Sequence, residues 1–236
     1  MLSCTIDAKE GRDIATADIP GAFLQSDMDE KVHMQLDGKM AELLVKIEPA
    51  LYRKYLQNEH GKPVMYVELR KALYGTLCAA ILFWRKLSSV LMDQGFVLNP
   101  YDSCVANKMI NGKQCTILWH VDDLKISHMD PTVVTSVLEK LTGVFSTQPS
   151  LSITRGKVHE YLGMTLDFSK QGTVEIKMDK YIKDMLDGVP DDMKGESPTP
   201  AANHLFQVNE INPTSLDGST AMLFHHNVAK LLFLCK

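Results

Sequence analysis

The chain lacks any hydrophobic run long enough to cross a membrane, and its N-terminus does not have the pattern of a secretory signal peptide. A membrane-spanning helix needs about 20 consecutive apolar residues, and no stretch of this sequence approaches that length. The first residues turn charged at positions 7–10, where a signal peptide would continue into an apolar segment. The sequence therefore predicts an intracellular protein with no membrane partner.

Paired cysteines are missing from the sequence, and the spacing of its cysteines matches none of the common zinc motifs. The five cysteines are an odd number and form no Cys-x-x-Cys pair, which favours reduced thiols in an intracellular compartment. The adjacent His225 and His226 would point to different sides of a helix and match no zinc spacing. We therefore expect neither a disulfide framework nor a zinc site.

Positive charge is also in short supply. The 236 residues carry a net charge of −4 and contain no long basic run, whereas phosphate contacts need Lys and Arg. An enzyme acting on nucleic acid would have to gather its basic residues in one cleft or use segments outside this chain. The sequence has no Gly-rich phosphate loop, which argues against a P-loop nucleotide-binding enzyme. It also has no Gly-x-Ser-x-Gly motif, which argues against an α/β-hydrolase.

The rest of the composition is that of an ordinary globular protein. With 45% apolar and 23% charged residues, the chain is predicted to form one large domain or a domain plus an appendage. Strands and helices alternate along it, and Asn111-Gly112 is a favoured hairpin turn. The expected fold class is α+β, with helices on one face of a mostly antiparallel sheet. Periodicity predicts strands over 12–19, 32–36, 64–69, 103–110, 114–121, 161–168 and 173–178, and helices over 41–56, 75–94, 131–141, 179–186 and 219–235.

The most informative feature is an acidic step, Asp122-Asp123, inside the apolar run of residues 116–126. Two ionised carboxylates in apolar surroundings repel each other and lose hydration, so they need a counter-charge. A divalent cation is a common chemical answer, and carboxylate oxygens suit Mg²⁺ or Mn²⁺. The alternative is that this pair forms only a strand-ending turn.

A second carboxylate, Asp18, has a similar setting within residues 14–24. A short strand-like run leads to Asp18, and Pro20-Gly21 then turns the chain. Asp18 alone could simply cap the following turn or helix. Together with Asp122, it makes a metal-binding constellation at the ends of two apolar strands.

Three motifs in this order resemble the reverse transcriptase of copia-type LTR retrotransposons. They are Asp-x-x-x-Ala-Phe-Leu at 18–24, Lys-Ala-Leu-Tyr-Gly at 71–75 and x-Val-Asp-Asp at 120–123. Weaker matches are residues 95–96, 101–104, 161–164, 198–200 and 228–232, and the loops look closest to diatom elements. The resemblance implies the palm of a right-hand polymerase followed by a thumb-like segment.

The resemblance also implies how the chain is divided. Residues 1–150 would be the palm with partial fingers, and residues 151–187 a primer-grip-like hairpin and the start of the thumb. Residues 188–203, rich in Pro, Asp, Gly and Ser, would be a linker, followed by a truncated thumb-like or connection-like helical segment at 204–236. We expect a fragment that lacks the N-terminal fingers and the RNase H region.

The implied activity is RNA-directed DNA polymerisation with two Mg²⁺ or Mn²⁺ ions. Asp18 and Asp122 would bridge both metals, Asp123 would be the third, more peripheral acid, and the backbone carbonyl of Ile19 would complete the ligands. The implied partners are an RNA template, a DNA primer or RNA–DNA hybrid, a dNTP, and the integrase and RNase H parts of a polyprotein. The expected location is the cytoplasm, in a virus-like particle, or the nucleus.

The resemblance assigns further residues to the nucleotide. Phe23 lies where related polymerases place an aromatic ring that rejects a ribose 2′-hydroxyl, although it could instead be a core residue. Tyr74 and Gly75 would flank the nucleotide or template.

The primer would contact His120 and the segment Tyr161-Leu162-Gly163. The alternative for this segment is an ordinary sheet hairpin. His120 and His128 flank the acidic step and are weaker candidates for metal ligands.

The sequence departs from the family in its second motif. Copia-type enzymes carry Lys-Gln-Ala-Pro-Arg after Leu-Tyr-Gly, but residues 76–84 lack this Gln and Arg. A catalytically inactive remnant is therefore one alternative, although retention of all three carboxylates favours activity. A Mg²⁺-dependent phosphohydrolase is another alternative, and it would need a water-activating base that only His120 could supply.

Overall fold

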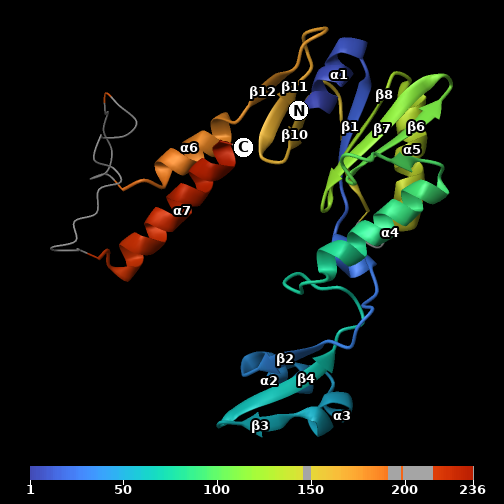
Figure 1. Ribbon diagram of the computed structural model, residues 1–236. Helices are drawn as coiled ribbons and strands as arrows, with labels where there is room; N and C mark the ends of the chain where they lie inside the picture. The colour runs from blue at the N-terminus through green and yellow to red at the C-terminus, as the bar shows by residue number, and fades with distance from the viewer. Residues whose placement is uncertain (146–149, 191–197, 199–214, 236) are drawn as a thin grey trace. The chain divides into compact units, whose positions relative to one another are not determined.

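The computed structural model of the chain describes residues 1–145, 150–190, 198 and 215–235. The chain divides into two compact units, Met1–Ile176 and Lys177–Lys236. The first unit carries two three-stranded sheets and a six-stranded sheet, with helices packed against the largest sheet (Figure 1).

The largest sheet has six strands in the order β5-β6-β7-β8-β1-β9, and every neighbouring pair is antiparallel. The predicted hairpin is confirmed: Asn111 and Gly112 join β6 to β7 with φ angles of 51° and 73°. Two positive φ angles are what a type I′ turn requires, and Asn and Gly tolerate them best. The strands are β1 (Asp13–Asp18), β5 (Val97–Leu98), β6 (Val105–Ile110), β7 (Lys113–His120), β8 (Asp123–His128) and β9 (Ser152–Arg155).

Two long helices, α4 (Ala79–Asp93) and α5 (Pro131–Phe145), cover one face of this sheet. Their apolar residues recur at helical spacing and meet the alternate residues of the strands. Helix α4 begins four residues later than predicted, because Gly75 adopts a φ of 95° that a helix cannot contain. The buried contacts of this core include Ala15, Ala17, Phe83, Leu87, Ile117, Trp119, Leu124, Ile126, Val134, Leu141 and Phe145.

The opposite face carries a helix that the sequence did not predict, α1 (Leu2–Glu10). The expectation that helices lie on one face only is therefore wrong. Few large apolar residues mark α1, because it buries the small side chains of Cys4 and Ala8. It shares a second core with the sheet formed by β10 (Val158–Tyr161), β11 (Met164–Asp167) and β12 (Glu175–Lys177). The predicted strand 161–168 is really the end of β10, a turn and β11.

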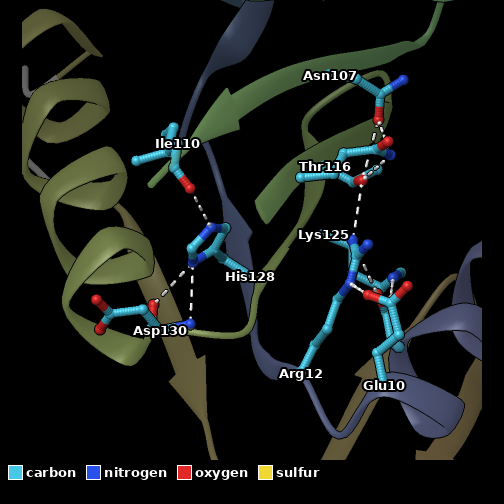
Figure 2. A network of polar contacts seen from close by, with 10 residues as sticks. Glu10, Arg12, Asn107, Ile110, Thr116, Lys125, His128 and Asp130 are labelled. Carbon is cyan, nitrogen blue, oxygen red and sulfur yellow. Dashed lines mark hydrogen bonds and ion pairs between the residues drawn. The ribbon is translucent and has the colours of Figure 1, made fainter. Parts of the chain in front are cut away.

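A polar network holds α1 to the central strands (Figure 2). Lys125 on β8 forms an ion pair with Asp7 on α1, and each side chain is only 1% exposed. Arg12 lies beside this pair, with Nη1 3.8 Å from Asp7 Oδ1 and Nε 2.8 Å from Glu10 Oε2. Arg12 Nη1 also donates to Thr116 Oγ1 on β7 at 3.1 Å. Charges buried this deeply are stable only when they are paired.

Residues 33–68 form a small sheet, β2-β4-β3, inserted between β1 and α4. The single helix predicted over 41–56 is interrupted at Pro49, because proline cannot donate the backbone hydrogen bond of a helix interior. The elements around it are the 3₁₀ turn η1 (Ala22–Gln25), β2 (His33–Asp37), α2 (Lys39–Ile47), α3 (Pro49–Tyr52), the 3₁₀ turn η2 (Arg53–Tyr55), β3 (Gln57–Glu59) and β4 (Lys62–Glu68).

In the second unit, the described residues form the two predicted helices, α6 (Asp179–Asp187) and α7 (Gly218–Leu234). Tyr181 joins them, because its hydroxyl donates to the carbonyl of Lys230 at 3.1 Å and its ring packs against Phe233. Most of the predicted linker at 188–203 lies outside the described residues. Within the described part of the chain, no helix combines the length and apolar character needed to span a membrane.

Replacing Lys125 with Met should destabilise the first unit strongly, because Asp7 would stay buried without its closest cation. We expect the free energy of unfolding, measured by urea denaturation, to fall by about 3 kcal/mol. Adding Asp7→Leu to Lys125→Met should restore most of the loss. Arg85→Met removes an exposed pair with Asp29 and should change stability much less. Equal effects of Lys125→Met and Arg85→Met would contradict this account.

Candidate active site

The three predicted carboxylates converge where β1 meets the turn between β7 and β8. Asp18 is the last residue of β1 and lies directly opposite Asp123, the first residue of β8. Asp122 lies in the turn directly before Asp123, and its carbonyl accepts a hydrogen bond from the N–H of Ile19 at 3.1 Å. Asp122 does lie in a strand-ending turn, but the turn also brings it to Asp18, 104 residues away in the sequence.

The turn contains an unusual backbone conformation at Val121. His120 pairs with Asp123, so the turn consists of Val121 and Asp122 alone. The φ angle of Val121 is 58°, which is strained for a β-branched residue and costs about 1–3 kcal/mol. A positive φ at the first central residue matches the tight turns that join twisted antiparallel strands. Pairing on both sides holds Val121 in this conformation and thereby fixes Asp122.

Electrostatics at this point favour a cation. Burial, and then the charge of Asp122, raise the pKa of the Asp18 carboxyl. Burial raises the pKa of Asp123 in the same way, followed by the charges of Asp122 and Asp18, while His120 acts in the opposite direction. Such mutual repulsion is what a divalent ion relieves, and carboxylate oxygens are suitable ligands.

The carboxylates are not yet arranged as a finished metal site. Among the residues that the structure describes, no group of three or more His, Cys, Asp or Glu is placed to hold a metal ion. The Asp122 carboxylate has a different partner, because its Oδ2 accepts a hydrogen bond from the hydroxyl of Tyr74 at 3.1 Å. The residue types of Asp18, Asp122 and Asp123 nevertheless fit a divalent metal.

Tyr74 and Phe23 form an aromatic wall beside Asp122. Their ring centroids are 4.3 Å apart, and Phe23 also contacts Phe83 of the main core at 6.4 Å. Burial and the charge of Asp122 raise the pKa of the Tyr74 hydroxyl, which therefore stays protonated as a donor. Phe23 is thus a core residue and at the same time a neighbour of the site, while Gly75 follows Tyr74 in a left-handed conformation.

The predicted primer-binding segment is the tip of the β10–β11 hairpin. Leu162 and Gly163 form its turn with φ angles of 50° and 74°. Tyr161 is buried and lines a cavity of about 150 Å³ together with Asp18 and Asp123. The structure therefore brings the hairpin tip to two of the three carboxylates.

Sequence reasoning missed four polar residues of this cavity: Thr16, Ser152, Thr154 and Glu160. Thr16 precedes Asp18 by two positions, so strand alternation could have placed it on the same face. The other three come from β9 and β10, and no short-range signal links those strands to β1. Only the pairing of β9 with β1 brings Ser152 opposite Asp18.

The two candidate histidines have different surroundings. His128 is buried, and both of its ring nitrogens are engaged by the backbone: Nδ1 accepts from the N–H of Asp130 at 2.9 Å, and Nε2 lies 3.3 Å from the carbonyl of Ile110 (Figure 2). It is a satisfied core residue rather than a metal ligand. His120 lies at the turn and lines an apolar recess of about 360 Å³ with Trp119 and Val121.

The family model for "Reverse transcriptase (RNA-dependent DNA polymerase)" matches residues 1–193. The chain belongs to the reverse transcriptase family. All three motifs that carried the resemblance lie within the matched region, and the resemblance to copia-type elements is confirmed by the relatives below.

Three similar proteins come from transposons. The reverse transcriptase chain is 27% identical over 200 residues to the retrovirus-related Pol polyprotein from transposon TNT 1-94 of Nicotiana tabacum, covering 82% of this chain and 14% of the relative. It is 25% identical over 165 residues to the putative transposon Ty5-1 protein of Saccharomyces cerevisiae, covering 70% and 46%. It is 26% identical over 173 residues to the retrovirus-related Pol polyprotein from transposon RE1 of Arabidopsis thaliana, covering 73% and 10%. The chain thus spans less than half of each relative.

Among solved structures, this reverse transcriptase chain is similar to apo telomerase from Candida tropicalis truncated from the C-terminal domain. The TM-score is 0.42 at 10% identity, over 75% of this chain and 38% of that one. A likeness at this level says nothing about function.

Replacing Asp18 with Asn should stabilise the protein at neutral pH. Because the folded pKa of Asp18 is raised, the stability linked to its proton is complete below its unfolded pKa and is lost as the pH rises through the folded pKa. After allowance for solvent screening, we expect the variant to gain about 0.5 kcal/mol of unfolding free energy at pH 7. The gain should vanish below pH about 3, where the wild-type carboxyl is also neutral. Urea unfolding at both pH values would test this, and a gain of the same size at both would count against it.

Proposed function

We propose that this reverse transcriptase chain catalyses RNA-directed DNA synthesis as part of a retrotransposon polyprotein. In this reaction the primer 3′-hydroxyl attacks the α-phosphate of a dNTP, so that one phosphorus–oxygen bond forms and the bond to pyrophosphate breaks. The observation that carries the proposal is the convergence of Asp18, Asp122 and Asp123 at one end of strands β1 and β8, in a chain of this family.

The proposed metal ligands are Asp18 and Asp122, which would bridge two ions, with Asp123 and the carbonyl of Ile19 beside them. When bound, Mg²⁺ or Mn²⁺ supplies positive charge to the attacking and leaving oxygens. The chain itself contributes position: the β1–β8 pairing holds Asp18 against Asp123, and the bond from Ile19 to Asp122 fixes the turn. Tyr74 would release Asp122 as the site fills.

We propose that the aromatic wall receives the sugar and base of the dNTP. Phe23 is placed by its contacts with Tyr74 and Phe83, so a flat, immobile ring would stand next to the carboxylates. A ring in this position could exclude a ribose 2′-hydroxyl by steric contact. Gly75 would flank the nucleotide or template on the other side of Tyr74.

The primer terminus is proposed to lie between His120 and the hairpin tip at Tyr161, Leu162 and Gly163. The cavity shared by Tyr161, Asp18 and Asp123 supports this placement, because the 3′-hydroxyl must reach the carboxylates. We also propose the domain assignment that the resemblance implies: palm with partial fingers at 1–150, primer-grip-like hairpin and start of the thumb at 151–187, linker at 188–203, and a truncated thumb-like or connection-like segment at 204–236.

The RNA template, the DNA primer or RNA–DNA hybrid, and the integrase and RNase H parts of a polyprotein are proposed partners. They are supported by relatives named as Pol polyproteins that are much longer than this chain. The proposed place of action is inside the cell, in a cytoplasmic virus-like particle or in the nucleus.

The test is primer extension on an RNA template with Mg²⁺ or Mn²⁺, comparing the wild type with Asp122→Asn. We expect the variant to lose at least about a hundredfold in rate, because it removes charge needed at the metals, while circular dichroism shows an unchanged fold. Asp29→Asn, a change outside the carboxylate cluster, should keep wild-type extension. A folded wild-type protein that extends no primer would favour the inactive remnant, and equal extension by Asp122→Asn would refute the assigned site.

Phe23→Val should weaken the rejection of ribonucleotides. We expect the ratio of kcat/KM for dNTP over rNTP to fall by about tenfold or more, because this single contact would discriminate by sterics. Phe83→Leu is the matched control, since it removes the neighbouring ring from the same core. A fall of the same size in both variants would show that core packing, and not a steric gate, governs the ratio.

A further inference from the structure

A hydrogen bond outside all the recognised motifs joins the β10–β11 hairpin to the catalytic strand. Thr16 Oγ1 on β1 lies 3.3 Å from His159 Nδ1 on β10. Both side chains are buried, with 7% of Thr16 and 1% of His159 exposed. A buried polar contact between residues 143 positions apart is costly to lose, because both groups would be left without a partner.

The roles of the two atoms follow from the second contact of the ring. His159 Nε2 lies 3.0 Å from the carbonyl of Gly156, which can only accept a hydrogen bond. Nε2 therefore carries the proton, and Nδ1 of the neutral ring accepts from the Thr16 hydroxyl. Burial lowers the pKa of His159; the hydrogen bond to Gly156 and the charge of Asp13 oppose this effect, while the charges of Lys125 and Arg155 act with burial, and the net shift favours the neutral ring. The tautomer needed for the bond to Thr16 is thus fixed by Gly156.

The spacing of residues along β1 and β10 explains how the bond between Thr16 and His159 determines where Tyr161 lies. Thr16 pairs with Lys125 on β8, and Asp18, two residues further, pairs with Asp123. On β10, Tyr161 likewise lies two residues after His159, and both point to the buried side. Because side chains on one face repeat every two residues, holding His159 at Thr16 places Tyr161 at the carboxylates, where it lines their cavity.

A slip of the hairpin would undo this arrangement. Moving β10 by one residue would turn Tyr161 away from the buried side that it shares with His159. Glu160, which also lines the cavity, accepts a hydrogen bond at its Oε1 from the Thr165 hydroxyl at 2.6 Å, but that contact lies within the hairpin. The bond from Thr16 to His159 instead ties the hairpin to the catalytic strand.

We propose that His159 is a positioning residue which, through Thr16, fixes the primer-binding hairpin tip against the catalytic carboxylates. This inference rests on the proposed function. It predicts that weakening the bond loosens the hold on the primer terminus and leaves binding of the dNTP almost unchanged. It also predicts a local change in the hairpin that can be measured without any catalysis.

The experiment compares the wild type with Thr16→Val, which removes the hydroxyl and keeps the shape of the side chain. Thr16→Ser retains the hydroxyl and is the matched control. In the full 236-residue chain, we expect Thr16→Val to raise the KM for primer–template by about threefold to tenfold, the range expected for one hydrogen bond. The KM for dNTP at saturating primer should change less than about twofold, and Thr16→Ser should behave as the wild type.

The second readout is amide hydrogen exchange of residues 158–167. In Thr16→Val we expect faster exchange there and unchanged exchange in β8, whereas a general loss of stability would accelerate both. His159→Leu should reproduce the pattern, and the double variant should be no worse than His159→Leu alone if the two residues act through one bond.

Primer extension and hydrogen exchange together distinguish a failure of the proposed polymerase activity from a failure of the proposed role of His159. If the wild type extends no primer, the proposed function fails, and the exchange data alone decide whether His159 anchors the hairpin. Unchanged hydrogen exchange at residues 158–167 in Thr16→Val would refute the proposal that the bond between Thr16 and His159 holds the hairpin in place. Faster exchange with an unchanged KM for primer–template in an active enzyme would overturn the role in primer positioning.

Discussion

Repulsion among three carboxylates is the constraint on which the site depends. Asp18 and Asp123 face each other across the β1–β8 pair, and Asp122 occupies the turn beside them. These half-buried carboxylates lose hydration and repel one another, and the raised pKa values of Asp18 and Asp123 reflect both effects. A stable sheet is needed to hold like charges together, and the antiparallel register, the strained Val121 and the bond from Ile19 supply that rigidity.

The two faces of the six-stranded sheet are stabilised in different ways. Helices α4 and α5 bury a continuous apolar core on one face, which contributes stability through the hydrophobic effect. The opposite face holds polar groups that are buried but paired: Asp7 with Lys125, Arg12 with Thr116, and Thr16 with His159. These contacts require particular partners at particular distances, so they specify where α1 and β10 lie as well as stabilising them.

Local signals predicted the central part of the fold well. The Asn111-Gly112 turn, the strand leading to Asp18 and the helix beginning at Pro131 each follow from chemistry within a few residues. Prediction failed where the deciding contact is distant. Helix α1 has little apolar periodicity and depends on Lys125, more than a hundred residues away. The predicted strand over 161–168 hid a turn, because Leu162 adopts a positive φ that its residue type does not signal.

By itself, the sequence singled out the residues that we propose carry the chemistry. Asp18, Asp122 and Asp123 stand out because carboxylates interrupt apolar runs, and the ordered motifs identify the family. Only the tertiary structure decided how these residues meet: that Asp18 faces Asp123, that Tyr74 binds Asp122, and that Tyr161 and Glu160 line the carboxylate cavity. The physical reason is that charge, size and apolarity belong to single residues and can be read one at a time. Register and burial are properties of pairs, and here the pairs join strands that are far apart in the chain.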